Sequence, residues 1–268
     1  MPYANNNGVK IYYEVEGQGP PLVLAHGGGI GNLDGWRRYG YTEALNSEYQ
    51  LILFDARGHG QSDKPHEVSA YGPKMADDVV SVLDNLGINR AHYLGYSTGA
   101  LTGFLLAAHI PERFYSFIIG CMSPYGFPEE MVKMTNKGIE ELKLFLTDPK
   151  AALRHREQNI GRSLTIGEKN TLLAIDAEAT ISMLTAQFDI RMNDQDLASI
   201  PVPCLVYCGD IDPLHTGAKE SVNHIPKARF ISLPGIAHVP AWSRSDLVLP
   251  HIKEFLAKVS KHDIARGG

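Results

Sequence analysis

Short apolar segments, each long enough for one buried strand, alternate along this chain with longer amphipathic segments, and few folds accept such an alternation. Apolar runs of this kind occupy residues 22–25, 51–54, 92–94, 114–121, 204–207 and 229–233. Helical spacing of apolar residues occurs at 75–86, 101–108 and 247–259. Strands that alternate with helices pair in parallel through crossover connections. We therefore predict an α/β fold with a mostly parallel central sheet, helices on both faces, and residues 9–15 as an antiparallel edge strand.

One stretch interrupts this alternation. Between Ser123 and Val202 the sequence shows helical patterns and no convincing strand. The apolar residues of the first helical pattern share one face, and they are Met131, Met134, Leu142, Phe145 and Leu146. Because ligands of open α/β sheets bind at the carboxyl ends of the strands, we expect a helical insertion over that end. The prediction is a core domain of residues 1–123 and 196–268 with a helical cap at 124–195.

Charge and cysteine content exclude several classes of protein. The chain has 25 Lys and Arg against 30 Asp and Glu, a net charge of −5, whereas nucleic-acid-binding domains usually present a basic face. No apolar run approaches the ~20 residues that span a bilayer, and the start of the chain lacks the pattern of a secretory signal. Cys121, Cys204 and Cys208 are an odd number without metal-clip spacing, so we expect reduced, buried thiols. The prediction is a cytoplasmic protein that binds no nucleic acid, membrane, metal or organic cofactor.

The segment Gly95-Tyr96-Ser97-Thr98-Gly99 is a G-x-S-x-G between a predicted strand and a predicted helix. A serine in this place sits on a sharp, strained turn that presents its hydroxyl at the end of the sheet, and glycines supply the clearance. The next backbone N–H, that of Thr98, begins a helix, where free donors and the helix dipole favour negative charge. The context predicts a nucleophilic serine.

A serine hydroxyl needs a base and a group that orients the base. Two acids, Asp210 and Asp212, follow the strand at 204–207, and His238 follows the strand at 229–233 in a loop bounded by Gly and Pro. All lie where strands end, and the order Ser, Asp, His is the order expected of a nucleophile elbow on this type of sheet. We favour Asp212 over Asp210 as the acid. The other histidines except His26 are interpreted as surface or packing residues.

His26-Gly27-Gly28-Gly29 follows the strand at 22–25. Three glycines allow the backbone to approach a substrate, so that an N–H can point at a developing oxyanion. A flexible turn is the alternative interpretation. Phosphate binding is disfavoured, because there is neither a G-x-G-x-x-G followed by a ribose-binding acid nor a P-loop lysine.

Together with the stretch from Asp55 to Ser62, these motifs resemble the α/β-hydrolase superfamily, and they run in the family order from residue 22 to residue 240. The resemblance implies Ser97 as nucleophile, His238 as base and Asp212 as the group that orients it. It also implies oxyanion donors at the backbone N–H groups of Gly28 and Thr98, a structural role for the Asp55 stretch, and a helical cap that shapes the pocket.

Two departures narrow the resemblance. Ser97 stands where the dehalogenases and epoxide hydrolases of the family carry an aspartate nucleophile, so those branches are disfavoured. Meta-cleavage C–C hydrolases often carry Trp directly after the catalytic His. Here Val239 follows His238, so that branch is also less favoured. We therefore favour a serine carboxylic-ester hydrolase acting on a small-molecule ester.

Two other functions remain open from the sequence. A lactonase or C–C hydrolase would use the same three residues, because the cap decides which substrate fits. A non-catalytic ligand receptor on this fold is the third hypothesis. The aromatic and methionine residues of the insertion suggest a largely apolar pocket, and they are Tyr125, Phe127, Met131, Met134 and Phe188.

Overall fold

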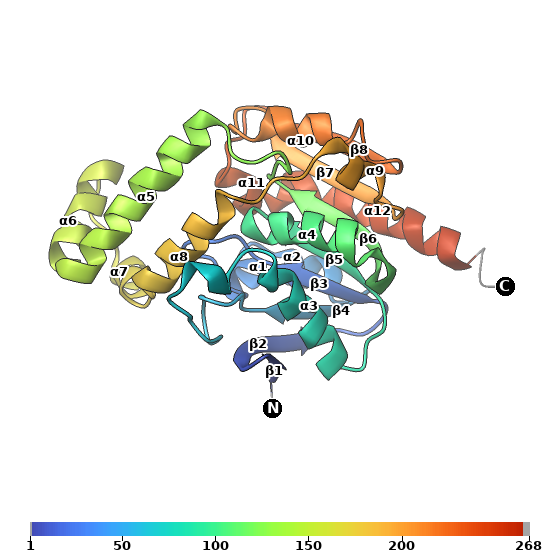
Figure 1. The fold of residues 1–268 in the computed structure, drawn as a ribbon, viewed down its shortest axis with the longest axis horizontal. Helices are drawn as coiled ribbons and strands as arrows, with labels where there is room; N and C mark the ends of the chain where they lie inside the picture. The colour runs from blue at the N-terminus through green and yellow to red at the C-terminus, as the bar shows by residue number, and fades with distance from the viewer. Residues whose placement is uncertain (1, 265–268) are drawn as a thin grey trace.

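A computed structural model describes residues 2–264 of the chain (Figure 1). One eight-stranded sheet forms its centre, with the strand order β1-β2-β4-β3-β5-β6-β7-β8. The pairs β1–β2 and β2–β4 are antiparallel, and every other pair is parallel. The strands are β1 (Tyr3–Asn6), β2 (Val9–Glu16), β3 (Pro21–Ala25), β4 (Gln50–Phe54), β5 (Ala91–Tyr96), β6 (Phe114–Gly120), β7 (Cys204–Gly209) and β8 (Ala228–Leu233). The predicted α/β fold with a mostly parallel sheet is confirmed.

Helices lie on both faces of this sheet, as expected. In Figure 1, α3 and α4 lie in front of the strands and α12 runs behind β6 and β7. The strands β3 to β7 are almost completely buried because both of their faces are covered. The helices outside the region between β6 and β7 are α1 (Asp34–Arg38), α2 (Tyr41–Leu45), α3 (Lys74–Asn85), α4 (Thr98–His109), α10 (His215–Ser221), α11 (Pro240–Ser243) and α12 (Ser245–Ile264), with short 3-10 turns at Val68–Ala70 and Pro111–Arg113.

The edge of the sheet differs from the prediction. The segment at 9–15 is an antiparallel strand, but β1 pairs with its outer side, so β2 is not the edge. Asn7 and Gly8 connect the two strands with φ angles of +51° and +93°. An Asn-Gly pair favours such a two-residue hairpin, because both residues tolerate positive φ. Sequence analysis missed β1 because Tyr3–Asn6 is short and rich in asparagine, which is depleted in strands.

The region between β6 and β7 contains helices and no strand, as the sequence indicates. These helices are α5 (Glu129–Thr147), α6 (Pro149–Ile160), α7 (Ile166–Leu173), α8 (Ala177–Gln187) and the short α9 (Asp194–Ala198). In Figure 1, α5 to α8 project to one side of the sheet. The starts of α6 and α7 are capped by side chains: Asp148 accepts the N–H of Ala151, and Thr165 forms a capping box with Glu168. The division into a core and a cap at 124–195 stays a prediction, and its second boundary falls within α9.

Within residues 2–264, no helix is both long and apolar enough to cross a membrane.

Candidate active site

Ser97 occupies the turn between β5 and α4 in a conformation that L-residues rarely adopt. Its φ and ψ angles are +53° and −116°. Two backbone hydrogen bonds hold it there: its N–H donates to the carbonyl of Gly120 (2.8 Å), and its carbonyl accepts from Leu101 (2.9 Å). Such a conformation costs about 1–3 kcal/mol and persists only where the surroundings enforce it. The sharp turn predicted for the G-x-S-x-G segment is therefore present.

The two glycines of this segment are required by close packing between backbones. A Cβ atom on Gly95 would lie 2.4 Å from the carbonyl oxygen of Gly99. A Cβ atom on Gly99 would lie 2.2 Å from the carbonyl oxygen of Ala25 at the end of β3. Neither neighbour can move without shifting a strand or a helix. The glycines thus let α4 leave the sheet directly beneath the serine.

The turn brings Ser97 against two side chains from distant parts of the chain. Its Oγ lies 2.9 Å from Nε2 of His238, which follows β8. The other ring nitrogen of His238, Nδ1, lies 2.8 Å from Oδ2 of Asp212, which follows β7. The side chain of Asp212 is fully buried and that of His238 is 18% exposed. The three residues singled out by chain order are therefore joined in one hydrogen-bonded series.

The surroundings of Asp212 favour its ionised form. Burial alone would raise the pKa of this carboxyl group, but the hydrogen bond and charge of His238, together with the N–H of Leu214, hold the pKa below its ordinary value. Leu214 donates its N–H to Oδ1 at 2.9 Å. With Asp212 ionised, Nδ1 of His238 carries the proton and Nε2 presents its lone pair to Ser97.

Asp210, the alternative acid, takes a different position. Its Oδ1 accepts the backbone N–H of Gly235 at 2.7 Å, and its side chain is on the surface. This bond ties the loop after β7 to the loop that carries His238. Between the two acids weighed from the sequence, the structure places Asp212 beside the imidazole.

Gly28 and Thr98 lie next to each other beside Ser97. A Cβ atom on Gly28 would be 2.7 Å from both Oγ1 of Thr98 and Cε of Met183, so these side chains would have to shift to admit a larger residue. Both residues line a cavity of about 180 Å³ together with Ser97 and His238. The N–H of Thr98 belongs to the first turn of α4, where helix donors have no partner within the helix. Both residues predicted to supply oxyanion donors thus line the same cavity as Ser97.

His26 supports this loop, and sequence analysis did not assign it a role. One ring nitrogen lies 2.7 Å from the carbonyl oxygen of Gly27, and the other accepts the N–H of Ala56 at 3.0 Å. Burial lowers the pKa of His26 to about 4, so its ring is neutral, with one nitrogen donating and the other accepting. A histidine directly after a buried apolar strand was the signal available in the sequence.

Gln187 of α8 was also missed. Its amide Nε2 donates to Oγ1 of Thr98 at 3.1 Å, and both side chains are buried. Gln187 lines the same 180 Å³ cavity as Ser97. This bond links the helical region after β6 to the residue that follows the serine.

The Asp55 stretch is structural, as the resemblance implies. Asp55 accepts the N–H groups of Leu33 (2.9 Å) and Gln61 (2.8 Å) through its two carboxylate oxygens. Arg57 forms a buried ion pair with Asp78 of α3. These bonds fix the loop after β4 and do not reach Ser97.

A larger, mainly apolar pocket of about 350 Å³ also opens onto Ser97 and His238. Its walls come from the insertion helices and from the loops after β3 and β8. Trp242, which sequence analysis missed, stacks on Tyr96 with ring centroids 5.2 Å apart and forms part of the wall. The large apolar and aromatic side chains that line the pocket are Ile30, Tyr39, Tyr96, Leu142, Phe145, Leu172, Ile175, Leu184, Val239 and Trp242.

The apolar residues expected in the pocket are only partly there. Phe127 and Met131 line the smaller cavity, and Phe188 packs edge-on against Phe127. Met134 is 52% exposed, and the hydroxyl of Tyr125 bonds to Asp194 instead. Leu146, expected on the same helical face as Met134, is 53% exposed.

The expected single apolar face of the first insertion helix was therefore wrong in part. Leu142 and Phe145 do line the pocket, but α5 is long and packs on α6 and α8 in different places along its length. No single stripe of residues faces the pocket along the whole helix.

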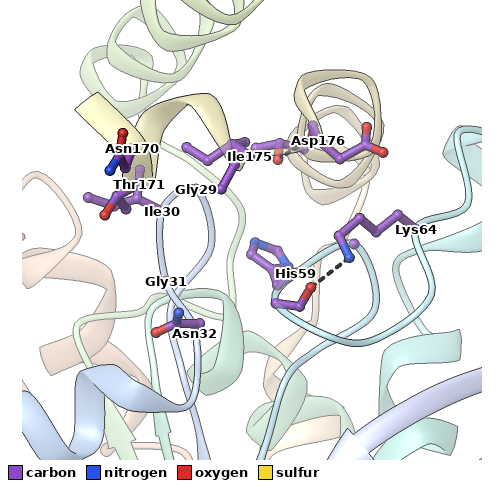
Figure 2. A pocket seen from close by; sticks show the side chains of 14 residues that line it. Gly29, Ile30, Gly31, Asn32, His59, Lys64, Asn170, Thr171, Ile175 and Asp176 are labelled. Carbon is purple, nitrogen blue, oxygen red and sulfur yellow. Dashed lines mark hydrogen bonds between the residues drawn. The ribbon is translucent and has the colours of Figure 1, made fainter. Parts of the chain in front are cut away.

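A third pocket, of about 360 Å³, shares the Gly29–Gly31 segment with the 350 Å³ apolar pocket (Figure 2). Its two charged groups already have partners: the Lys64 ammonium donates to the carbonyl of Gly60 (2.6 Å), and Asp176 contacts His66 (3.1 Å). Nε2 of His59 is buried and has no hydrogen-bond partner among the described residues. Burial lowers the pKa of His59, which also lines this pocket, to about 3. Ser97 and His238 do not line it, so the pocket is separate from the reacting groups.

One group of side chains has the composition of a metal site. Sulfur atoms of Cys121 and Cys208 and a carboxylate oxygen of Asp212 lie within 4.8 Å of one another. A thiol must lose its proton to bind a metal, and a hydrogen bond to Cys121 together with burial raises the pKa of Cys208 far above its usual range. Both oxygens of Asp212 are engaged by His238 and Leu214. These contacts favour a buried pair of thiols behind the acid.

Comparisons with known proteins show which family and fold the chain resembles. The family model of the alpha/beta hydrolase fold matches residues 20–137. The 3-oxoadipate enol-lactonase 2 of Acinetobacter baylyi is 32% identical over 216 residues, which are 78% of this chain and 79% of that protein. A pimeloyl–acyl-carrier-protein methyl ester esterase of Aeromonas hydrophila is 28% identical over 265 residues, which are 92% of this chain and 100% of that protein.

A solved structure extends the similarity to the fold as a whole. The enol-lactonase of Burkholderia xenovorans superimposes with a TM-score of 0.75 at 26% sequence identity, covering 96% of this chain and 100% of that one. Since the similarity in sequence and in fold extends over most of the chain, this protein belongs to the α/β-hydrolase superfamily and is a hydrolase.

Proposed function

We propose that this protein hydrolyses carboxylic esters of small molecules through an acyl-enzyme on Ser97. The observation that carries the proposal is the series Ser97 Oγ–His238 Nε2 (2.9 Å) and His238 Nδ1–Asp212 Oδ2 (2.8 Å). A neutral imidazole held in this tautomer by a buried carboxylate is the base that a serine hydroxyl requires.

In the first half of the proposed reaction, Nε2 of His238 takes the hydroxyl proton while Ser97 Oγ attacks the ester carbonyl. The carbonyl oxygen becomes negative and accepts the N–H groups of Gly28 and Thr98. His238 then gives the proton to the departing alcohol, and the acyl group stays on Ser97. In the second half, His238 activates a water molecule, which releases the acid. Each oxyanion donor is expected to contribute about 10²–10³ in turnover.

Hydrolysis of p-nitrophenyl acetate and butyrate by the wild type and by Ser97→Ala tests the proposal. The variant is expected to lose several orders of magnitude in kcat, on the order of 10⁴–10⁶. Ser199→Ala is the matched control, because Ser199 is exposed at the end of α9 and its hydroxyl bonds only to the carbonyl of Asp196. Equal rates for wild type and Ser97→Ala would overturn the proposal.

A lactonase is the second candidate, and the similarity to enol-lactonases favours it. A lactone is a cyclic ester, so the same residues would open it. Turnover of lactones far above that of every open-chain ester would select this function. C–C bond cleavage is tested in the same panel with ring-cleavage products.

Covalent labelling of Ser97 by a fluorophosphonate separates these enzymes from a ligand receptor on the same fold. An activated serine reacts with the probe, whereas an unactivated hydroxyl does not. A folded sample that fails to label at Ser97 would favour the receptor.

A further inference from the structure

The apolar pocket beside Ser97 contains one ion pair. Among the residues that line it, Glu141 and Arg156 are the only carboxylate and the only guanidinium or ammonium group. Glu141 comes from α5, next to Leu142, and Arg156 comes from the facing helix α6. The rest of the wall is mainly aromatic and aliphatic.

The two charges neutralise each other. Nη1 of Arg156 lies 3.3 Å from Oε2 of Glu141. The side chain of Glu141 is 14% exposed, whereas that of Arg156 is 41% exposed. The less exposed partner is therefore the carboxylate, and it contacts one nitrogen of the only guanidinium or ammonium group among the residues that line the pocket.

An anionic group that entered this pocket would lose water and would find the one guanidinium already paired with a carboxylate. Apolar walls cannot replace the hydrogen bonds of a carboxylate, and Glu141 both repels a second negative charge and competes for Arg156. A neutral alkyl or aromatic group meets none of these costs and gains the burial of its apolar surface. The pocket therefore discriminates by charge.

We propose that the Glu141–Arg156 pair makes this protein selective for esters whose longer arm is neutral and apolar, by excluding arms that end in a carboxylate. The selectivity rests on the proposed esterase function, because the pocket is assigned to one arm of an ester. Glu141 acts through Arg156 and is a positioning residue for specificity.

The test compares ligands that differ only in a terminal carboxylate. Methyl octanoate and monomethyl suberate share a chain of eight carbons, and their binding to Ser97→Ala is measured through tryptophan fluorescence, since Trp242 lines the pocket. We expect the neutral ester to bind at least ~10-fold more tightly than the anionic one. Adding Glu141→Gln frees the guanidinium for a charge-assisted bond, so affinity for the anionic ester rises ~10-fold while affinity for the neutral ester is unchanged.

Arg156→Met should act in the opposite direction. It leaves the Glu141 carboxylate unpaired in the pocket wall, so affinity for the anionic ester falls by a further ~10-fold. Combining Arg156→Met with Glu141→Gln removes both charges, and affinity for the anionic ester returns toward its starting value. Loss of local structure would instead weaken the binding of both esters in both single variants. Glu140→Gln is the matched control, because Glu140 is the neighbour of Glu141, pairs with Lys143 at 2.7 Å and does not line the pocket.

Hydrolysis gives the second measurement, with p-nitrophenyl octanoate and mono-p-nitrophenyl suberate and with Ser97 intact. The change in Glu141→Gln is expected in KM for the anionic ester, since the charge lies away from the reacting atoms. Equal effects of Glu141→Gln and Glu140→Gln on binding of the anionic ester, or an equal effect of Glu141→Gln on both ligands, would overturn the inference. Binding that follows the expected pattern without hydrolysis of any ester would refute the esterase function alone.

Discussion

Replacing Asp212 by asparagine changes the charge beside His238 with little change in shape. Oδ1 of the residue accepts the N–H of Leu214 at 2.9 Å, and an amide oxygen can keep that bond. The amide NH₂ would then face Nδ1 of His238 and donate to it. Nδ1 would have to accept, so the ring proton would move to Nε2, and Nε2 could no longer take a proton from Ser97.

The expected magnitude follows from the distance between the charges. When His238 becomes positive in the transition state, its Nδ1 lies 2.8 Å from the Asp212 oxygen. At an effective dielectric constant of ~20, a pair of unit charges at this distance interacts by on the order of 6 kcal/mol. A loss of this size lowers kcat by about 10⁴, the scale known for the corresponding change in serine triads.

The assay is the kcat for p-nitrophenyl butyrate in Asp212→Asn, with circular dichroism to show that the variant is folded. Asp210→Asn is the control, because Asp210 bonds to the N–H of Gly235 on the surface. We expect Asp210→Asn to stay within a few-fold of the wild type. Activity of Asp212→Asn within tenfold of the wild type, or an equal loss in Asp210→Asn, would refute the assignment of the acid.

Two further predictions concern stability. Gly99→Ala should destabilise the fold by about 3 kcal/mol or more, because its Cβ would lie 2.2 Å from a backbone oxygen. Gly138→Ala in α5 should instead stabilise the fold by about 1 kcal/mol, because its Cβ would meet nothing within 4 Å. Urea unfolding measures both changes. Acid should also destabilise the protein, since burial lowers the pKa from 6.5 to about 4 for His26 and to about 3 for His59. As the pH falls from 6.5 to 4 the unfolded chain binds protons that the folded state does not, so each histidine removes about 2 kcal/mol by pH 5. Urea unfolding at pH 7 and pH 5 measures the change, and imidazole NMR signals of His26 and His59 that titrate near pH 6.5 in the folded protein would contradict it.

The sheet and the turn that carries Ser97 were predictable from the sequence because their signals are local. A strand buried on both faces must be apolar throughout, and a helix that starts within one residue of the strand needs glycines on either side. Pairing within the hairpin of β1 and β2 also has a local signal in Asn7 and Gly8, which sequence analysis did not use. For the hydrogen-bonded series of Ser97, His238 and Asp212, the sequence predicted only the order Ser, Asp, His along the chain.

Sequence analysis favoured Asp212 over Asp210, but the physical basis of that preference lies in the tertiary structure. Both acids follow β7 within three residues, and no local pattern says which one turns inward. The decision depends on where β8 and its loop place His238, and that placement comes from the packing of the whole sheet.

The pocket depended still more on tertiary packing. The chain alone determined that an α/β core, a serine on a strained turn and a helical region after β6 would be present, because each follows from neighbours in sequence. Which side chains form the walls was decided by helices that meet from distant segments: Trp242 reaches Tyr96, Glu141 reaches Arg156, and Met134 turns to solvent. Amphipathic periodicity tells which residues of a helix are apolar, but the partner that a helix packs against decides which of them are buried.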